Sequence, residues 1–198
     1  MRLNLGCGNK HLDGWINADK VATPAVDQVV DLEQFPWPWP DDSAEEVLLF
    51  HVLEHLGAET AVYLGIIKEL YRVCRDGAKI MIAVPHPRHD SFLGDPTHVR
   101  PITPDSLLLF SQTANREWMA ANAANTPLGV YLGVDFVIES VNWKFEQSWK
   151  DRAERKEISL VELQHAMRTY NNVVKAIEMV LRPIKPAGRT SSSSAAAA

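Results

Sequence analysis

Short apolar runs, each ending in a polar residue, recur along the first half of the chain. The first run passes from Leu3 into a Gly-x-Gly turn at residues 6–8. Three more runs predict strands at residues 15–18, 26–30 and 46–50, which end at Asp19, Asp31 and His51. Ligands of open α/β sheets bind outside the carboxyl ends of the strands. The pattern therefore predicts a ligand site built from the residues that follow each strand.

A helical pattern follows the fourth strand. Between residues 59 and 75, apolar side chains recur at the spacing of one helix face. We expect this helix to end at residues 76–77, with Gly77 as a left-handed cap. The mostly apolar residues 78–84 are typical of a strand buried on both faces of a parallel sheet. Helix and strand together complete a βαβ unit.

The periodic pattern stops at residues 85–104, a stretch with prolines at positions 85, 87, 96 and 101. A long ordered loop in a compact domain is usually functional. A helix is expected from about residue 105, and another in the polar stretch 159–169. Residues 134–141 and 174–181 are strand-like, and we expect them to form an antiparallel pair at the sheet edge.

Composition fits one domain. A chain of 198 residues with 46% hydrophobic side chains can bury one core, and we expect that domain to span residues 1–187. Residues 188–198 end in runs of serine and alanine that have nothing to bury, so we expect a disordered tail.

Charge and cysteine content limit the partners and the cellular compartment that we expect. The net charge is −5 and the basic residues are scattered, whereas nucleic-acid binding needs a basic face. Two cysteines, Cys7 and Cys74, imply no disulfide framework. No apolar run is long enough to cross a membrane. We expect a cytoplasmic protein with neither nucleic acid nor membrane as a partner.

Five segments in combination resemble the class I S-adenosylmethionine-dependent methyltransferases, in the small subgroup that opens with Leu-Asn-Leu-Gly-Cys-Gly. The matching segments are residues 3–8, 14–19, 30–33, 50–56 and 95–101. The resemblance implies S-adenosylmethionine as the cofactor. It also implies an α/β fold, a Rossmann-like, mostly parallel seven-stranded sheet with helices on both faces and an antiparallel C-terminal strand pair.

The resemblance also implies roles for individual residues. The implied cofactor-binding residues are Gly6, Cys7, Gly8, Asp19, Asp31, Leu32 and His51. The turn would pass under the methionine part of the cofactor, and Asp19 would accept hydrogen bonds from the ribose hydroxyls. Asp31 and Leu32 would flank the adenine, and His51 would lie beside the methyl-bearing sulfur and the acceptor.

One departure from dinucleotide-binding proteins is informative. Only eleven positions separate Gly8 from Asp19, whereas a dinucleotide fold needs about twenty to fit a helix between turn and acid. A pyrophosphate ligand depends on the N-terminus of that helix. S-adenosylmethionine has no phosphate, so the short spacing disfavours NAD rather than the methyl donor.

The loop at residues 85–104 is the candidate acceptor site, with Asp95, His98 and Arg100 as binding residues. Positioning alone can drive much of a methyl transfer. If the acceptor is a hydroxyl, His51 or His98 is a candidate for removing its proton, and Asp95 for orienting that histidine or binding the acceptor. We therefore name His51, Asp95 and His98 as catalytic candidates. The expected acceptor is a small molecule or sugar, and the expected assembly a monomer or homodimer.

Other functions remain open on the sequence. A non-catalytic module that binds S-adenosylmethionine would have the same two cofactor-binding acids, Asp19 and Asp31. Residues 51–55 also spell His-x-x-Glu-His, which holds zinc on one helical face in a class of metallopeptidases. Imidazole and carboxylate ligands also occur together in the loop, at His86, His89, Asp90, Asp95 and His98. A five-residue match often arises by chance, and the spacing of the loop residues matches no strong metal signature. We therefore expect no metal, with Glu54 and His55 opening a helix and the loop histidines facing water.

Overall fold

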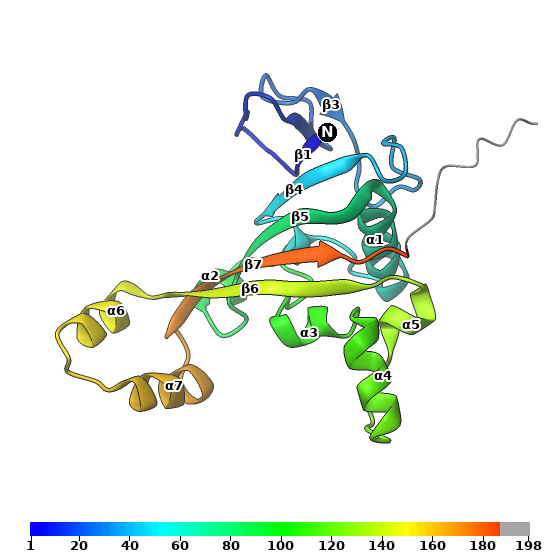
Figure 1. Ribbon diagram of the computed structural model, residues 1–198. Helices are drawn as coiled ribbons and strands as arrows, with labels where there is room; N and C mark the ends of the chain where they lie inside the picture. The colour runs from blue at the N-terminus through cyan, green and yellow to red at the C-terminus, as the bar shows by residue number, and fades with distance from the viewer. Residues whose placement is uncertain (187–198) are drawn as a thin grey trace, which may run out of the picture.

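The computed structural model describes residues 1–186, in which one seven-stranded sheet has the order β3-β2-β1-β4-β5-β7-β6 (Figure 1). The strands are β1 (Arg2–Leu5), β2 (Ile16–Asp19), β3 (Gln28–Val29), β4 (Ala44–Phe50), β5 (Cys74–Pro85), β6 (Phe136–Phe145) and β7 (Val174–Pro183). Strands β1 to β5 are parallel, and β7 is antiparallel to both β5 and β6. The predicted mostly parallel sheet with an antiparallel C-terminal pair is confirmed.

The helices all follow β4. They are the 3-10 turn η1 (Leu53–His55) and the helices α1 (Thr60–Val73), α2 (Asp90–Leu93), α3 (Pro104–Leu108), α4 (Gln112–Ala120), α5 (Leu128–Leu132), α6 (Gln147–Glu154) and α7 (Leu160–Thr169). Within the described residues, only loops join β1, β2, β3 and β4. The spacing of Gly8 and Asp19 thus correctly predicted that no full helix lies between them.

One hydrophobic core lies between the sheet and α1. The alternation of β4 and β5 directs Val47, Leu49, Ile80 and Ile82 into this core, where each is at most 1% exposed. Helix α1 adds a stripe of buried side chains at helical spacing, namely Tyr63, Ile66, Ile67, Leu70 and Tyr71. Burying a Leu or Ile side chain fully contributes about 1.5–3 kcal/mol, so this interface fixes α1 against the sheet.

The end of α1 differs from the sequence prediction. The helix ends at Val73, and Gly77, expected as its cap, lies inside β5 with a φ of +65°. Ala44 pairs with Cys74 but Glu46 pairs with Lys79, so residues 75–78 form a bulge. Backbone N–H groups of residues 42 and 43 satisfy the last helix carbonyls. A glycine with positive φ fits a bulge as well as a helix cap.

The loop at residues 85–104 is ordered and returns to the strand ends. It contains α2, and its far end docks on η1, where the N–H groups of Val99 and Arg100 donate to the Glu54 carbonyl at 2.8 and 3.3 Å. The Arg100 side chain donates to the Gly57 carbonyl at 2.8 Å. These bonds hold the predicted acceptor loop beside the residues that follow β4.

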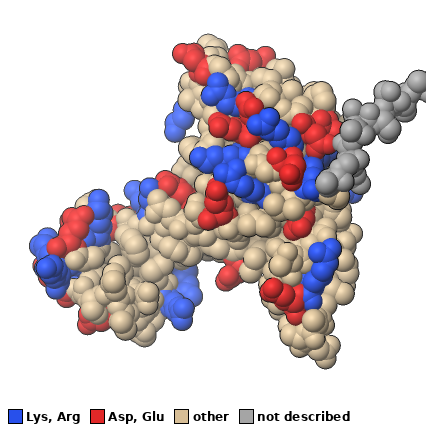
Figure 2. Space-filling model, viewed as in Figure 1, with Lys and Arg blue, Asp and Glu red and all other residues tan. Residues whose placement is uncertain are grey.

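The connection from β6 to β7, residues 146–173, carries α6 and α7 and forms an arm that protrudes from the body of the molecule (Figures 1 and 2). A small cluster of Leu163, Ala166 and Val173 is buried there, apart from the main core. On the face in Figure 2, basic and acidic side chains are interspersed. Helices long and apolar enough to span a membrane are absent from residues 1–186. The predicted tail at residues 188–198 lies outside the described residues.

Candidate functional site

A cavity of about 360 Å³ lies at the carboxyl ends of the first four strands. It is lined by the residues that follow these strands, by the η1 region and by one residue of the acceptor loop. These are Gly6, Asp19, Lys20, Val30, Asp31, Leu32, Glu33, His51, Val52, His55, Leu56 and Thr97. Cavities of this size hold small ligands. Five of the predicted cofactor-binding residues, Gly6, Asp19, Asp31, Leu32 and His51, lie together in this lining.

The turn after β1 brings its backbone close to the segment after β4. Gly6 has a φ of +64°, and a Cβ built there would lie 2.5 Å from a methyl carbon of Val52. Glycine is therefore the residue that fits. Gly8 also has a positive φ, and its N–H donates to Asp19 Oδ2 at 2.8 Å. The turn and the acid that ends β2 thus form one hydrogen-bonded unit.

The Asp19 carboxylate is held from behind by the backbone. Oδ2 accepts from the Gly8 N–H, and Oδ1 accepts from the Val21 N–H at 3.0 Å. A carboxylate oxygen has two lone-pair directions, so each oxygen keeps one acceptor position. Because Asp19 also lines the cavity, two adjacent hydroxyl groups would fit this pair of acceptors.

The segment after β3 supplies a second acid beside an apolar side chain. Asp31 is exposed, and its Oδ1 accepts from the Glu33 N–H at 2.9 Å. Leu32 is 5% exposed and lines the cavity. Glu33 lines it as well, and its Oε1 accepts from the Gly57 N–H at 2.7 Å. This part of the cavity thus offers an apolar side chain, Leu32, beside a hydrogen-bond acceptor, Asp31.

Cys7 and Gly8 lie outside the cavity lining. The Cys7 side chain is 5% exposed, and its Sγ lies 3.8 and 3.9 Å from the carbonyl oxygens of Gly8 and Ala25. Burial, helped by the charge of Asp19, raises the pKa of the Cys7 thiol above its ordinary value. Cys7 is therefore a neutral packing residue behind the turn.

His51 stands between the cavity and η1. It adopts a left-handed conformation with a φ of +58°, which is uncommon outside glycine, and its N–H donates to the Ala83 carbonyl at 2.8 Å. Such conformations cost of order 1–3 kcal/mol and cluster at functional sites. The side chain is 59% exposed, and Nδ1 lies 3.3 Å from Glu54 Oε1.

Thr97 connects the acceptor loop to η1. Its hydroxyl donates to Asp95 Oδ1 at 2.6 Å and lies 2.9 Å from His55 Nδ1. Asp95 Oδ1 also accepts from the Thr97 N–H at 2.8 Å. These two bonds, chiefly the one from the hydroxyl, hold the pKa of Asp95 below its usual value. Asp95 itself does not line the cavity.

His98 is buried next to His55. Its side chain is 8% exposed, its Nδ1 lies 2.9 Å from the Phe92 carbonyl, and its ring stacks on Phe92 with centroids 5.2 Å apart. The rings of His55 and His98 have centroids 4.6 Å apart. His98 thus lies behind His55 rather than in the cavity lining.

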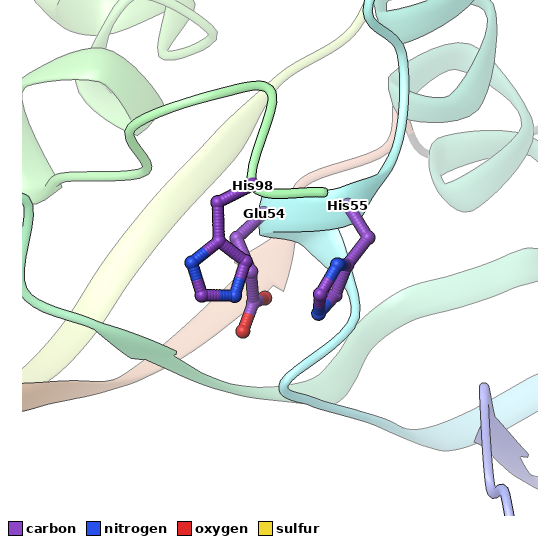
Figure 3. Close-up of side chains that lie close together, drawn as sticks. All are labelled: Glu54, His55 and His98. Atoms are coloured by element: carbon purple, nitrogen blue, oxygen red, sulfur yellow. The ribbon is translucent and has the colours of Figure 1, made fainter. Parts of the chain in front are cut away.

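Glu54, His55 and His98 converge (Figure 3). One potential ligand atom from each lies within 4.8 Å of the others. This group takes two members from the His-x-x-Glu-His motif and one from the acceptor loop, a combination that the sequence pattern did not suggest. Only the contact between the loop and η1 brings the three together.

The structure forms neither metal set that the sequence suggested. Residues 51–55 do not form the α-helix that the metallopeptidase motif needs, because η1 is a 3-10 turn and α1 begins at Thr60. Glu54 and His55 lie in the short 3-10 helix η1 and not at the start of α1, so the expected helix is present only as this single turn. His86 packs on Trp143, and His89 lies near Ser91 and Glu146. His89 is buried and the His98 side chain is only 8% exposed, so the expectation that the loop histidines face water is wrong for both.

Several cavity residues were not predicted from the sequence. Val52 and Leu56 are apolar residues after a strand, and nothing in their type separates them from core residues. Thr97 lies inside the quoted loop segment but was not singled out. The sequence Asp95-Pro96-Thr97 favours a turn in which the aspartate side chain bonds to the residue two positions later. This turn is the signal that could have identified Thr97.

Solved structures with this fold were found at low sequence identity. A SAM-dependent methyltransferase from Archaeoglobus fulgidus has a TM-score of 0.57 and 17% identity, with 91% of this chain and 85% of that chain covered. One from Methanosarcina mazei has a TM-score of 0.50 and 12% identity, with 93% and 92% covered. The [4+2]-cyclase SpnF has a TM-score of 0.51 and 14% identity, with 93% and 75% covered.

No protein-family model and no curated protein matches the sequence. The solved structures show that the chain has the fold found in SAM-dependent methyltransferases. At these sequence identities the likeness concerns the fold alone. One protein with this fold is a cyclase by its own description. Fold by itself does not fix the reaction, which has to be argued from the site.

Proposed function

We propose that this protein is an S-adenosylmethionine-dependent methyltransferase acting on a small molecule or sugar. The observation that carries the proposal is the cavity at the strand ends, lined by the Gly6 turn, Asp19, Asp31 and Leu32. These are the residues that the family resemblance assigns to the cofactor. The fold, shared with SAM-dependent methyltransferases, also supports it.

The proposed roles follow the observed chemistry of the cavity. Asp19, oriented by two backbone N–H groups, would accept hydrogen bonds from the ribose hydroxyls. Asp31 would accept from the adenine amine, and Leu32 would cover one face of the ring. Gly6, whose position leaves no room for a Cβ, would let the backbone approach the methionine part, with Cys7 and Gly8 supporting the turn from behind. When bound, S-adenosylmethionine supplies an electrophilic methyl group on a positively charged sulfur.

On the acceptor side, His51 is the proposed general base for a hydroxyl acceptor. It lines the cavity and its imidazole is mostly exposed, and a base must reach the proton that it removes. The His98 side chain is buried behind His55 and does not line the cavity, so it is not the proposed base. Asp95 holds Thr97, and through it His55, which makes Asp95 a positioning residue.

Calorimetry with S-adenosylhomocysteine, the demethylated product, tests the cofactor site. We expect one molecule bound per chain. Asp19→Ala should raise the Kd at least about tenfold, because hydrogen bonds to a charged group contribute about 1.5–3 kcal/mol. Asp13→Ala is the control, since Asp13 is fully exposed, lies outside the cavity lining and pairs with His11. Thermal melting of both variants checks that the fold survives.

Two results would contradict the proposal. The first is no detectable binding at millimolar ligand, and the second is an Asp19→Ala variant that binds like the wild type. Formation of S-adenosylhomocysteine from S-adenosylmethionine, in the presence of small hydroxyl compounds and sugars, then tests turnover. Binding without turnover on every acceptor would instead favour a non-catalytic module.

We further propose a cytoplasmic protein that acts as a monomer or homodimer without a nucleic-acid partner. Both cysteines, Cys7 and Cys74, are free and buried, as suits a reducing compartment. Size-exclusion chromatography with light scattering determines the assembly.

A further inference from the structure

The Glu54 carboxylate is buried without a hydrogen-bond partner. Its side chain is 1% exposed, and neither Oε1 nor Oε2 has a partner among the described residues. The backbone is fixed independently, because the Glu54 carbonyl accepts from two N–H groups of the acceptor loop. Burying an ionised carboxylate is strongly unfavourable unless a positive charge or a proton compensates it. The side chain therefore requires a compensating partner.

The nearby basic side chains, His51 and Arg100, do not form a hydrogen bond with the Glu54 carboxylate. His51 Nδ1 lies 3.3 Å from Oε1, but without the angles of a hydrogen bond, and it would need to be protonated. Arg100 forms no ion pair with Glu54 within residues 1–186; its guanidinium lies over the Tyr63 ring, and it donates to the Gly57 carbonyl.

Hydrogen bonds fix which nitrogen of each neighbouring histidine carries the lone pair. The Thr97 hydroxyl gives its one hydrogen to Asp95 Oδ1, so it accepts from His55 Nδ1. His98 Nδ1 faces a carbonyl, that of Phe92, and must donate. In the neutral rings Nε2 of both His55 and His98 is then the lone-pair nitrogen.

Two imidazole lone pairs and a buried carboxylate at close range repel one another unless a proton or a metal cation lies between them. The ligand atoms lie within 4.8 Å of one another. Atoms bound to one ion at about 2.0–2.2 Å lie about 3–4 Å apart, so small side-chain rotations complete a site (Figure 3). Metal-binding histidines commonly donate their other N–H to a carbonyl, hydroxyl or carboxylate, and here both do.

We propose that Glu54, His55 and His98 bind a divalent transition-metal cation, and that this ion holds an oxygen atom of the acceptor. Two nitrogen ligands and one carboxylate suit ions such as Mn²⁺ or Zn²⁺ rather than Ca²⁺. Three protein ligands leave at least one coordination position open. His55 and Thr97 line the proposed methyl-transfer cavity, so an acceptor in that cavity lies next to the ion. This second part rests on the proposed function.

Metal binding is measured on the full chain after dialysis against EDTA. Electron paramagnetic resonance counts free Mn²⁺, and calorimetry follows Zn²⁺. We expect one ion per chain, with an affinity at least about tenfold lower in Glu54→Gln, His55→Gln and His98→Gln. His89→Gln is the matched control, because His89 is a buried histidine of the same loop outside the group. Melting curves show that each variant folds, and Mn²⁺ should raise the Tm of the wild type and of the control only.

Calorimetry with S-adenosylhomocysteine in EDTA, on the same samples, separates the two proposals. Cofactor binding without Mn²⁺ or Zn²⁺ binding up to millimolar concentration overturns the metal site, as do ligand variants that bind metal like the wild type. Metal binding without cofactor binding overturns the proposed function and keeps the metal site. Turnover that survives EDTA in a chain that binds metal overturns the acceptor role.

Discussion

Two glycines of the first turn share a backbone conformation for different reasons. Gly6 and Gly8 both have a positive φ, +64° and +54°, which costs other residues about 1–2 kcal/mol. Only Gly6 is also confined, since a Cβ there would lie 2.5 and 2.8 Å from methyl carbons of Val52, while nothing lies within 4 Å at Gly8. Gly6 thus joins the end of β1 to the segment after β4.

Alanine substitutions separate these two effects. Gly8→Ala should lower the free energy of unfolding by about 1 kcal/mol through its φ alone. Gly6→Ala should lower it by about 1–3 kcal/mol more, because the new methyl group overpacks against Val52. Chemical denaturation measures both. Val52→Ala in the Gly6→Ala background should recover part of the excess loss, and strictly additive effects of the two changes would show that this contact is not the cause.

The positions of Asp19, Asp31 and His51 in the cavity lining could be predicted because their signal is local. Asp19, Asp31 and His51 follow apolar runs, and strand ends are visible as the points where such runs stop. The burial of Glu54 could not be predicted, because its cause is non-local. A glutamate is ordinarily exposed, and the burial of Glu54 depends on the acceptor loop closing over η1.

At the scale of elements, the acceptor loop combines a local turn with a distant anchor. The Asp95 side chain accepts from the Thr97 N–H, a turn that the sequence specifies by itself. The docking of Val99 and Arg100 on η1 is non-local and cannot be read from spacing. The end of α1 at Val73 was missed for the same reason, because its last carbonyls bond to residues 42 and 43 rather than to a local cap.

Thr97→Val should raise the pKa of Asp95 toward its ordinary value. The hydroxyl of Thr97 is the main cause of the lowered pKa, and its N–H is the second, so part of the shift remains in the variant. A carboxyl whose pKa is lowered in the folded state stabilises it above the unfolded pKa and loses this effect as the pH falls through the folded pKa. The anchor of His55 should therefore weaken only in acid.

An NMR titration of the Asp95 carboxyl carbon measures this change, with Thr113→Val on α4 as the control. An Asp95 pKa equal in the wild type and in Thr97→Val would refute the hydrogen-bond assignment. Loosening of His55 at neutral pH in the wild type, seen as motion of its ring, would refute the acid-only dependence.

At the scale of the whole molecule, the arm is structurally separate from the cavity but touches the acceptor loop. Its buried cluster is distinct from the main core, and no residue between 147 and 172 lines the cavity. Asn172 Oδ1 accepts from the Asp90 N–H at 2.8 Å, and the Asn172 N–H donates to the Arg88 carbonyl at 3.0 Å. The arm therefore braces α2 at the base of the loop.

Replacing residues 147–172 by Asn-Gly tests this division. Glu146 and Val173 already face each other, with an N–H to carbonyl bond of 2.9 Å, and Asn-Gly forms two-residue hairpins readily. We expect the shortened chain to unfold cooperatively, because the main core is intact. Its Kd for S-adenosylhomocysteine should stay within about twofold of the wild type, which corresponds to about 0.4 kcal/mol.

Hydrogen exchange of the amides in α2 should become faster in the shortened chain, because the hydrogen bonds from Asn172 are gone. Asn172→Gly is the matched control: it keeps the positive φ of this position, +57°, and removes only the side-chain bond, so exchange should rise partway. Protection of α2 that is unchanged in the shortened chain would show that the arm does not brace the loop, and loss of cofactor binding in a folded chain would show that the cavity depends on the arm.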